Sequence, residues 1–296
     1  MKTATSTSRM YRKIARTALI FIFPVVIYNI VFRIYPIIYS LYLSFTKFSG
    51  LGTPKFVGIE NFQRLFADKE FWLSTLRTLQ FSAEVLPTNM LLSLLLALLI
   101  NRKMVGISLV RSICYLPVIT PMVAASVIWT WIYDPNVGIL NFVLNLFGIG
   151  PVNFLGNMST ALHSIVVMRV WRGVGWNMIV YLAGLQSIPK EVYEAASIDG
   201  ANSLQKFARI TLPLLRPVHM YVLLVGLAST LQTFTEVYVM TQGGPINSTT
   251  VVGLLIYKTA FDYMDMGYAS AMSFVVGTII MLVSILAVSR RKEIAM

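Results

Sequence analysis

The stretch EVYEAASIDGANSLQKFARITLPLLRP, residues 191–217, is the most informative part of this chain. It is a polar, charge-bearing island between two long apolar segments. Pro189 just before it and Gly200 within it are the expected start and stop of a helix of about three turns. Gly200 can take the left-handed backbone that a sharp reversal requires, and the following Asn-Ser pair can cap a second short helix that ends before Pro213. We therefore predict a helix-turn-helix element joining two apolar segments.

The first helix of this element has a surface suited to docking. Ala195 and Ala196 leave one face low and smooth, so that it can seat closely in a groove. Glu191 and Glu194 flank that face with charge. An ordinary amphipathic linker helix between two membrane spans is the alternative, which explains the polarity but not the whole set of spaced residues.

Composition places the chain among multi-pass membrane proteins. Apolar residues make up 56% and charged residues only 12% of its 296 residues, far from the values of a soluble domain. Six apolar runs each reach the roughly 20 residues that a helix needs to cross a bilayer. They cover residues 17–45, 79–100, 113–133, 161–188, 214–240 and 268–289. We therefore expect an all-α integral membrane protein with one six-helix transmembrane domain over residues 17–289. The first run contains Pro24 and Pro36, so we expect it to tilt, kink or project beyond the lipid.

Lysine and arginine positions predict the orientation of these spans. Of the 24 such residues, 15 precede the first span, lie between the second and third, fall in the loop 189–217 or follow the last span. Residues 1–16, together with Arg102 and Lys103, supply seven of them. The positive-inside rule then puts both termini, 1–16 and 290–296, in the cytoplasm with the loop. The net charge of +12 is explained by this topology and by anionic lipid, and does not indicate nucleic-acid binding.

The sequence offers no pattern for catalysis or metal binding. His163 and His219 are isolated, with no ligand-type residue at metal-binding spacing. The chain has no phosphate-binding Gly-x-x-x-x-Gly-Lys-Ser/Thr loop, no nucleophile elbow and no pair of carboxylates within one apolar run. We therefore expect a protein that is not an enzyme and binds no metal or cofactor of its own.

The island carries a fixed pattern that resembles a known family. Glu194-Ala195-Ala196 is followed by Gly200 after three residues, and then by Ile210, Leu212 and Pro213. This pattern is similar to the EAA loop, here residues 189–213, of the membrane-spanning subunits of ATP-binding-cassette (ABC) importers. Further markers along nearly the whole chain resemble the carbohydrate-type permeases of this class, which serve maltose, multiple sugars or glycerol phosphate. These are Tyr35-Pro36, residues 56–62, Asp134-Pro135, residues 138–141, Trp171-Arg172, residues 183–189 and residues 241–245.

The resemblance implies a type I permease fold and a division of labour among subunits. A second, homologous permease would complete the translocation path, two cytoplasmic ATPase subunits would bind ATP and Mg, and an extracytoplasmic solute-binding protein would dock outside. The complex would lie in a bacterial or archaeal plasma membrane and work by alternating access. Its ATPase-coupling residues would be Glu191, Glu194, Ala195, Ala196, Asp199, Gly200, Ala201, Leu212 and Pro213.

Polar residues within the spans are the candidates for a solute path, because a charge at mid-bilayer costs about 2.5 to 3.5 kcal/mol on insertion scales and tends to face the bundle interior. Arg169 and Arg172 share a face of the fourth span, and Gln232 and Glu236 are expected to share a face of the fifth. The proposed path residues are Trp171, Arg172, Trp176, Asn177, Tyr181, Gln232 and Glu236. For any one of them, an interhelical salt bridge, a snorkelling position or an interfacial aromatic anchor remains an alternative.

The solute expected from the resemblance is a carbohydrate or related polyol. The two arginines of the fourth span would suit an anionic solute, yet a Trp-Lys/Arg pair here is similar to permeases of neutral sugars, so a neutral carbohydrate is favoured. The alternative function is an ion-coupled secondary transporter or channel, which should carry its own ion site or an internal repeat. Neither is clear in this sequence.

Overall fold

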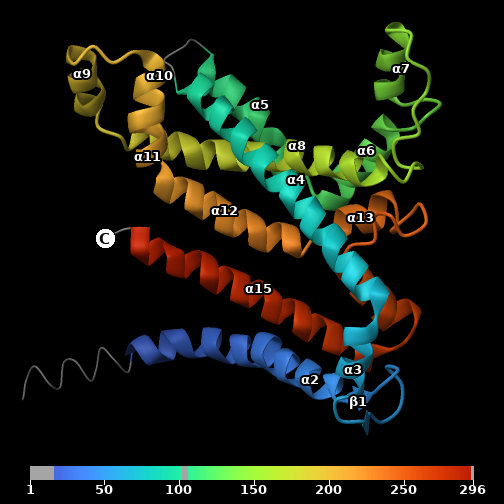
Figure 1. The fold of residues 1–296 in the computed structure, drawn as a ribbon. Coiled ribbons are helices and arrows are strands. Elements are labelled where there is room, and N and C mark those ends of the chain that lie inside the picture. The colour runs from blue at the N-terminus through green and yellow to red at the C-terminus, as the bar shows by residue number, and fades with distance from the viewer. Residues whose placement is uncertain (1–16, 102–105, 295–296) are drawn as a thin grey trace, which may run out of the picture. The chain divides into compact units, whose positions relative to one another are not determined.

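The computed structural model describes residues 17–101 and 106–294, and helices dominate it (Figure 1). The predicted basic N-terminus 1–16, Arg102 and Lys103, and residues 295–296 lie outside the described residues. The chain divides into two compact units. One unit comprises residues up to 67 with 256–276, and the other comprises 68–255 with the residues from 277 onward.

The first unit contains the N-terminal helix and the segment that follows it. The helix runs Thr17–Ser44. It includes the π turn η1 (Ile30–Ile34) and α2 (Tyr35–Ser44), and is followed by the strands β1 (Thr46–Lys47) and β2 (Lys55–Phe56), α3 (Glu60–Ala67), η3 (Lys258–Asp262) and the start of α15 (Met266–Ile294). The two strands form one antiparallel pair. Asn61 fastens α3 to the end of α2 and to β1, because its amide donates to the carbonyls of Ser44 and Thr46, both at 2.9 Å.

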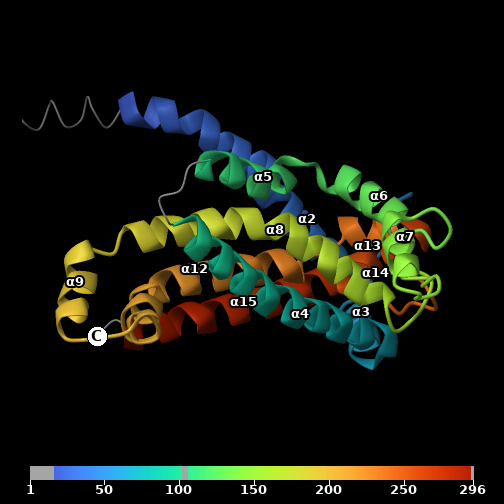
Figure 2. The ribbon, with the colours of Figure 1, turned by 90° about the horizontal axis from the view of Figure 1, so that it is seen from above.

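The second unit is a bundle built around α4 and α8. Its elements are α4 (Lys69–Ile100), α5 (Ile107–Ile119), α6 (Met122–Ile132), α7 (Ile139–Leu146), α8 (Ala161–Gln186), α9 (Lys190–Ile198), α10 (Ser203–Lys206), η2 (Phe207–Thr211), α11 (Leu212–Leu214), α12 (Arg216–Leu231), α13 (Thr235–Met240) and the start of α14 (Val252–Tyr257). Helix α8 packs against α4 and α5, and α12 packs against α4 (Figure 2). Asp68 caps α4, where its carboxylate accepts the backbone N–H groups of Glu70 and Phe71.

Two apolar clusters lie along α4 and α8, and a polar layer separates them. The first cluster includes Phe81, Val85 and Met168, and the second includes Leu94, Ala97 and Met178. Between these positions α4 carries Asn89 and Ser93, both buried. Since a buried polar group away from water needs a hydrogen-bond partner, this layer must also contain the partners of Asn89 and Ser93.

The apolar helices differ in detail from the six predicted spans. Within residues 17–101 and 106–294, two helices are long and apolar enough to cross a bilayer, Thr17–Ser44 and Lys69–Ile100, and two bent pairs would raise the number to four. In the bent pairs, Ile107–Ile119 meets Met122–Ile132 at 100°, and Ser203–Leu214 meets Arg216–Leu231 at 59°. Helix α8 is 26 residues long but carries two arginines.

One proline of the loop acts differently from the prediction. The second helix of the loop was expected to end before Pro213, but the helical path continues to Leu214. The physical reason is a π turn, η2, just before the proline, which widens the helix where the ring would clash with the preceding turn. The same arrangement, η1 followed by Pro36, keeps the first helix continuous.

Candidate functional site

The loop between α8 and α12 has the predicted helix-turn-helix geometry at its centre. Pro189 caps α9 with φ of −59°, and Gly200 follows its end with φ of +77°. A left-handed residue of this kind is most easily a glycine. Asn202 starts the second helix with a capping box, in which its side chain accepts from the Gln205 backbone and the Gln205 side chain accepts from the Asn202 backbone, both at 2.9 Å.

Helix α9 is held along one side only. None of its residues is buried. The Tyr193 hydroxyl lies 2.9 Å from the Thr211 hydroxyl, and Lys206 donates to the Ser197 hydroxyl at 2.6 Å. These contacts fasten α9 to the helical segment that leads into α12. The opposite side stays open, with Ile198 88% exposed.

The remaining predicted loop residues divide between this open surface and the apolar cluster below. Glu191, Glu194, Ala195, Asp199 and Gly200 are exposed, and Ala196 and Ala201 are half-buried. Leu212 packs against the cluster that contains Leu215, whereas Pro213 is exposed.

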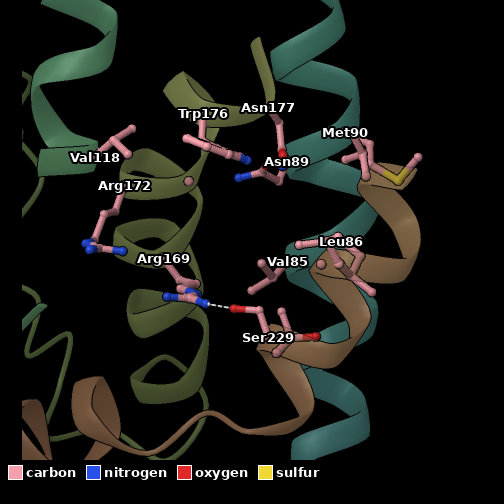
Figure 3. A pocket seen from close by; sticks show the side chains of 15 residues that line it. Val85, Leu86, Asn89, Met90, Val118, Arg169, Arg172, Trp176, Asn177 and Ser229 are labelled. Carbon is pink, nitrogen blue, oxygen red and sulfur yellow. Dashed lines mark hydrogen bonds between the residues drawn. The ribbon is translucent and has the colours of Figure 1, made fainter. Parts of the chain in front are cut away.

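A cavity of about 220 Å³ lies in the polar layer, between α4, α5, α8 and α12 (Figure 3). Its polar side chains come from three of these helices and include three of the predicted path residues, Arg172, Trp176 and Asn177. Asn89, Arg169, Ser229 and Thr230 complete them. Gly173 and Gly226 keep the wall open, because a methyl group at either would lie 2.6 Å from a side-chain atom of the facing helix α4.

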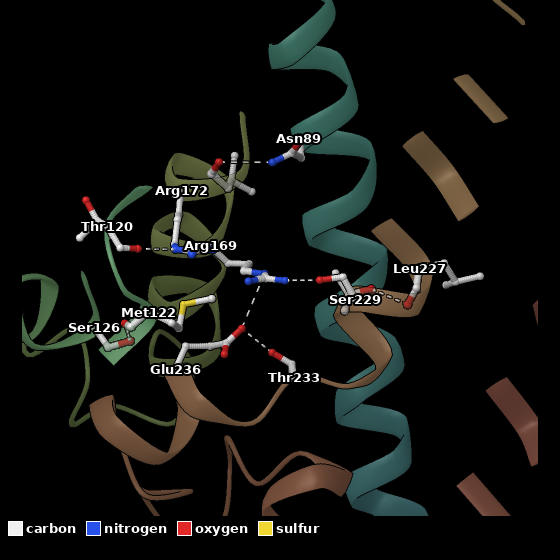
Figure 4. A network of polar contacts seen from close by, with 12 residues as sticks. Asn89, Thr120, Met122, Ser126, Arg169, Arg172, Leu227, Ser229, Thr233 and Glu236 are labelled. Carbon is white, nitrogen blue, oxygen red and sulfur yellow. Dashed lines mark hydrogen bonds and ion pairs between the residues drawn. The ribbon is translucent and has the colours of Figure 1, made fainter. Parts of the chain in front are cut away.

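Asn89 organises one side of the cavity. Its carbonyl oxygen accepts the Asn177 amide at 2.7 Å and the Ser93 hydroxyl at 3.2 Å, and its amide donates to the Val170 carbonyl at 3.3 Å. On the other side, Arg172 Nε donates to the Thr120 carbonyl at 3.2 Å (Figure 4). Thr120 lies in the break between α5 and α6, so the arginine satisfies a carbonyl that leaves the helix ladder there.

Arg169 lies at the centre of a second set of contacts. Its Nη2 donates to the Ser229 hydroxyl, and its Nε lies 3.6 Å from Glu236 Oε1 (Figure 4). The Glu236 side chain is only 3% exposed and also accepts a hydrogen bond from the Thr233 hydroxyl. A carboxylate buried this deeply requires a cation nearby, and Arg169 supplies it.

The other four predicted path residues do not line this cavity. Trp171 packs against Trp129, with ring centroids 5.5 Å apart, beside a separate apolar pocket. Tyr181 is fully buried, and its hydroxyl lies 2.9 Å from His219 Nδ1. Gln232 is exposed.

The prediction that Gln232 and Glu236 share a helix face is wrong. Helix α12 ends at Leu231 and α13 begins only at Thr235, so a break separates the two residues. Phe234 in this break has φ of −152° and ψ of −60°, which is not helical. Sequence reasoning also missed Asn89 and Ser229, although an asparagine within an apolar run is the signal that could have found the first of them.

The turn after α6 is held by its own polar groups. Asp134 Oδ1 accepts the backbone N–H groups of Asn136 at 2.8 Å and Val137 at 3.0 Å. These two bonds, that of Val137 foremost, lower the pKa of the Asp134 carboxyl, since they favour its charged form. The Asn141 side chain then ties the Asp134 carbonyl to the backbone of Val152.

Comparisons with known proteins agree with the resemblance. Residues 89–292 match the family described as "Binding-protein-dependent transport system inner membrane component". The chain is 35% identical to the lactose transport system permease protein LacF of Rhizobium radiobacter, over 98% of each chain. It is 34% identical to the trehalose/maltose transport system permease protein MalF of Thermococcus litoralis, over 88% of each.

Among solved structures, the fold is similar to a chain in the crystal structure of a bacterial alginate ABC transporter in complex with alginate pentasaccharide-bound periplasmic protein. The TM-score is 0.82 at 25% identity, covering 94% of this chain and 96% of the other.

Proposed function

This chain belongs to the family of binding-protein-dependent transport system inner membrane components, and from that premise we propose which solute it passes and how it is driven. It is a permease subunit of an ABC importer of the sugar type. We propose that its solute is a neutral carbohydrate or related polyol and that the cavity in the polar layer is part of the solute path. The alternative of an ion-coupled secondary transporter or channel has no comparable support.

The main support for this proposal is the chemistry of the cavity wall. It presents the amides of Asn89 and Asn177 near the indole of Trp176, and Arg172 also lines it (Figure 3). A sugar has hydroxyl groups around its ring and apolar C–H groups on its faces, so donors beside an aromatic face suit it. The relatives named for lactose and for trehalose and maltose support this solute class.

Coupling to ATP hydrolysis is proposed to run through α9 and α12. The open side of α9 would seat in a cleft of an ATPase subunit, with Glu194, Ala195, Ala196, Asp199 and Gly200 at the contact. Contacts of Tyr193 and Lys206 fasten α9 to the helical segment before α12. Because Val222, Val225 and Ser229 of α12 line the cavity, a displacement of the loop would reach the solute site along one helix.

The mechanism proposed is alternating access. ATP binding would bring the two ATPase subunits together, move the loops as levers and open the path outward, and hydrolysis would reset it. For this coupling, solute and nucleotide need different affinities for the two states. ATP and Mg would be bound by the ATPase subunits, and this chain would bind no cofactor or metal.

The proposed assembly has a second, homologous permease, two ATPase subunits and an extracytoplasmic solute-binding protein. Six membrane crossings would put both termini and α9 in the cytoplasm of a bacterium or archaeon. The lysine and arginine distribution supports this orientation. The alginate transporter, whose structure contains a periplasmic protein, supports a docked binding protein.

The experiment that tests the coupling role uses Gly200→Pro and Glu194→Lys in the assembled importer. Proline fixes φ near −65°, so it cannot take the φ of +77° at this position, and we expect solute-stimulated ATP hydrolysis to be lost. Gly200→Asn is the matched control, because asparagine tolerates the left-handed conformation and a Cβ atom there would meet nothing within 4 Å. Normal stimulation in both Gly200→Pro and Glu194→Lys complexes would exclude this role for α9.

A further inference from the structure

We propose that Glu236 is a positioning residue of the solute cavity, which holds the Arg169 guanidinium in the cavity wall and cancels its charge. The inference rests on the proposed function, because it takes the cavity to be part of the solute path. Glu236 lies outside the cavity and acts on Arg169, which lines it. Its consequence is that the solute meets one uncancelled positive charge, that of Arg172, instead of two.

The contacts of Arg169 show how this works. Arg169 lines the cavity, whereas Glu236 does not. The Nε edge of the guanidinium faces Glu236 at 3.6 Å, and Nη2 donates to Ser229 in the cavity wall (Figure 4). Thr233 donates to the same carboxylate oxygen that faces Arg169. Thr233 therefore fixes the Glu236 carboxylate, and Ser229 fixes the Arg169 guanidinium at its Nη2 end.

The charge balance follows from the lining residues. Among the described residues that line the cavity, Arg169 and Arg172 are the charged ones. Arg172 donates to the carbonyl of Thr120, a neutral acceptor, so the two arginines and Glu236 together leave one net positive charge at the cavity. Arg169 and Arg172 are three residues apart on α8. Two unit charges of like sign this close repel strongly where water is scarce. Glu236 reduces this repulsion because it cancels the charge of Arg169.

The break in the fifth predicted span separates the two residues that contact Arg169. Ser229 lies on α12, before the break, and Glu236 lies on α13, after it. The break packs tightly against α14, where a methyl group at Gly253 would lie 2.7 Å from the Thr233 carbonyl oxygen. When α12 moves with the coupling loop, the contact to Ser229 can change while Glu236 stays and keeps the Arg169 charge cancelled.

A purely structural ion pair would have the same distances, so the test must detect charge inside the cavity. Trp176 lines the cavity and is 47% exposed, which makes its fluorescence a reporter there. Quenching by iodide depends on local positive charge, whereas quenching by acrylamide depends on access alone. The ratio of the two quenching constants, measured on the assembled importer in nanodiscs without solute, reports the charge. A Trp176→Phe complex supplies the signal of all other tryptophans of the assembly, among them the other four of this chain, for subtraction.

Glu236→Gln should raise the iodide-to-acrylamide ratio of Trp176 at least about threefold, because it leaves Arg169 uncompensated. Adding Arg169→Gln to that variant should return the ratio to the native value. An unchanged ratio in Glu236→Gln, or a raised ratio that Arg169→Gln does not reverse, would overturn the proposal.

A second variant leaves the buried pair untouched, in case Glu236→Gln does not assemble. If Glu236 cancels Arg169, Arg172→Gln removes the remaining net charge, and the iodide quenching of Trp176 should lose its dependence on ionic strength. Persistent dependence on ionic strength would contradict the inference. Both measurements use no sugar, so they stand or fall separately from the solute-stimulated ATP hydrolysis that tests the proposed function.

Discussion

Gly175 permits a close backbone approach between α5 and α8, and its replacement by alanine should separate these helices. A methyl group at Gly175 would meet the Cys114 carbonyl oxygen and lie 3.1 Å from the Tyr115 Cα. Both are backbone atoms of α5, which no side-chain rotation can move. The matched control is Gly184→Ala on the same helix, where the methyl group would lie 2.7 Å from Val218 Cγ2, the end of a side chain.

The magnitude follows from two opposing terms. Overpacking costs typically 1 to 3 kcal/mol, and the upper end, about 3 kcal/mol, applies at Gly175 because the clash is with backbone. Replacing a helical glycine by alanine returns about 1 kcal/mol. We therefore expect Gly175→Ala to lose about 2 kcal/mol of stability. For Gly184→Ala the clash is with a side chain that can move, so the overpacking cost is at the lower end, about 1 kcal/mol. It nearly cancels the gain of about 1 kcal/mol from replacing glycine.

The assay follows thermal unfolding of the purified assembly together with maleimide labelling of Cys114, the single cysteine of the chain. A loss of about 2 kcal/mol should lower the unfolding midpoint by about 3 °C, because a chain of this length gains roughly 0.6 kcal/mol/K of entropy on unfolding. Displacement of α5 should also speed labelling of Cys114, which is half-buried in the native chain. Equal midpoints and equal labelling rates for the Gly175→Ala and Gly184→Ala proteins would refute this account of the packing.

Three further predictions concern the polar layer, the topology and the turn after α6. Asn89→Leu should cost about 1 to 2 kcal/mol of stability in thermal unfolding, because it leaves the Asn177 amide without its acceptor, and unchanged stability would show that this bond is dispensable. A membrane-impermeant amine label should reach Lys206 only from the cytoplasm and Lys55 only from outside, and the reverse pattern would overturn the orientation. Asp134 has a lowered pKa, so its contribution to the turn should be present at neutral pH and lost as the pH falls through that lowered pKa; limited proteolysis of the turn should follow this loss, and in an Asp134→Asn protein it should be independent of pH.

Local signals in the sequence were enough to predict the centre of the loop. The helix between Pro189 and Gly200 is present because its start and stop depend on the backbone preferences of those two residues. The cap at Asn202 is equally local. The continuation of the second helix past Pro213 was not foreseen, since it depends on a π turn that the residue pattern does not reveal.

The cavity depends on contacts between distant parts of the chain. Asn89 and Asn177 meet only because α4 and α8 are rotated so that both face the polar layer. The two breaks within predicted spans are likewise supported from elsewhere, one by Arg172 binding the Thr120 carbonyl and the other by packing of the Thr233 carbonyl against Gly253. Apolar periodicity places a helix in the membrane but does not fix which of its faces meets which neighbour.

The central claim is that this chain works as one subunit of an ATP-driven importer. The most direct test is to purify it from its native membrane under mild conditions and to identify by mass spectrometry the proteins that accompany it in fixed proportion. The account predicts an ATPase subunit and a second, homologous permease. Recovery of the chain alone, or associated only with itself, would contradict it.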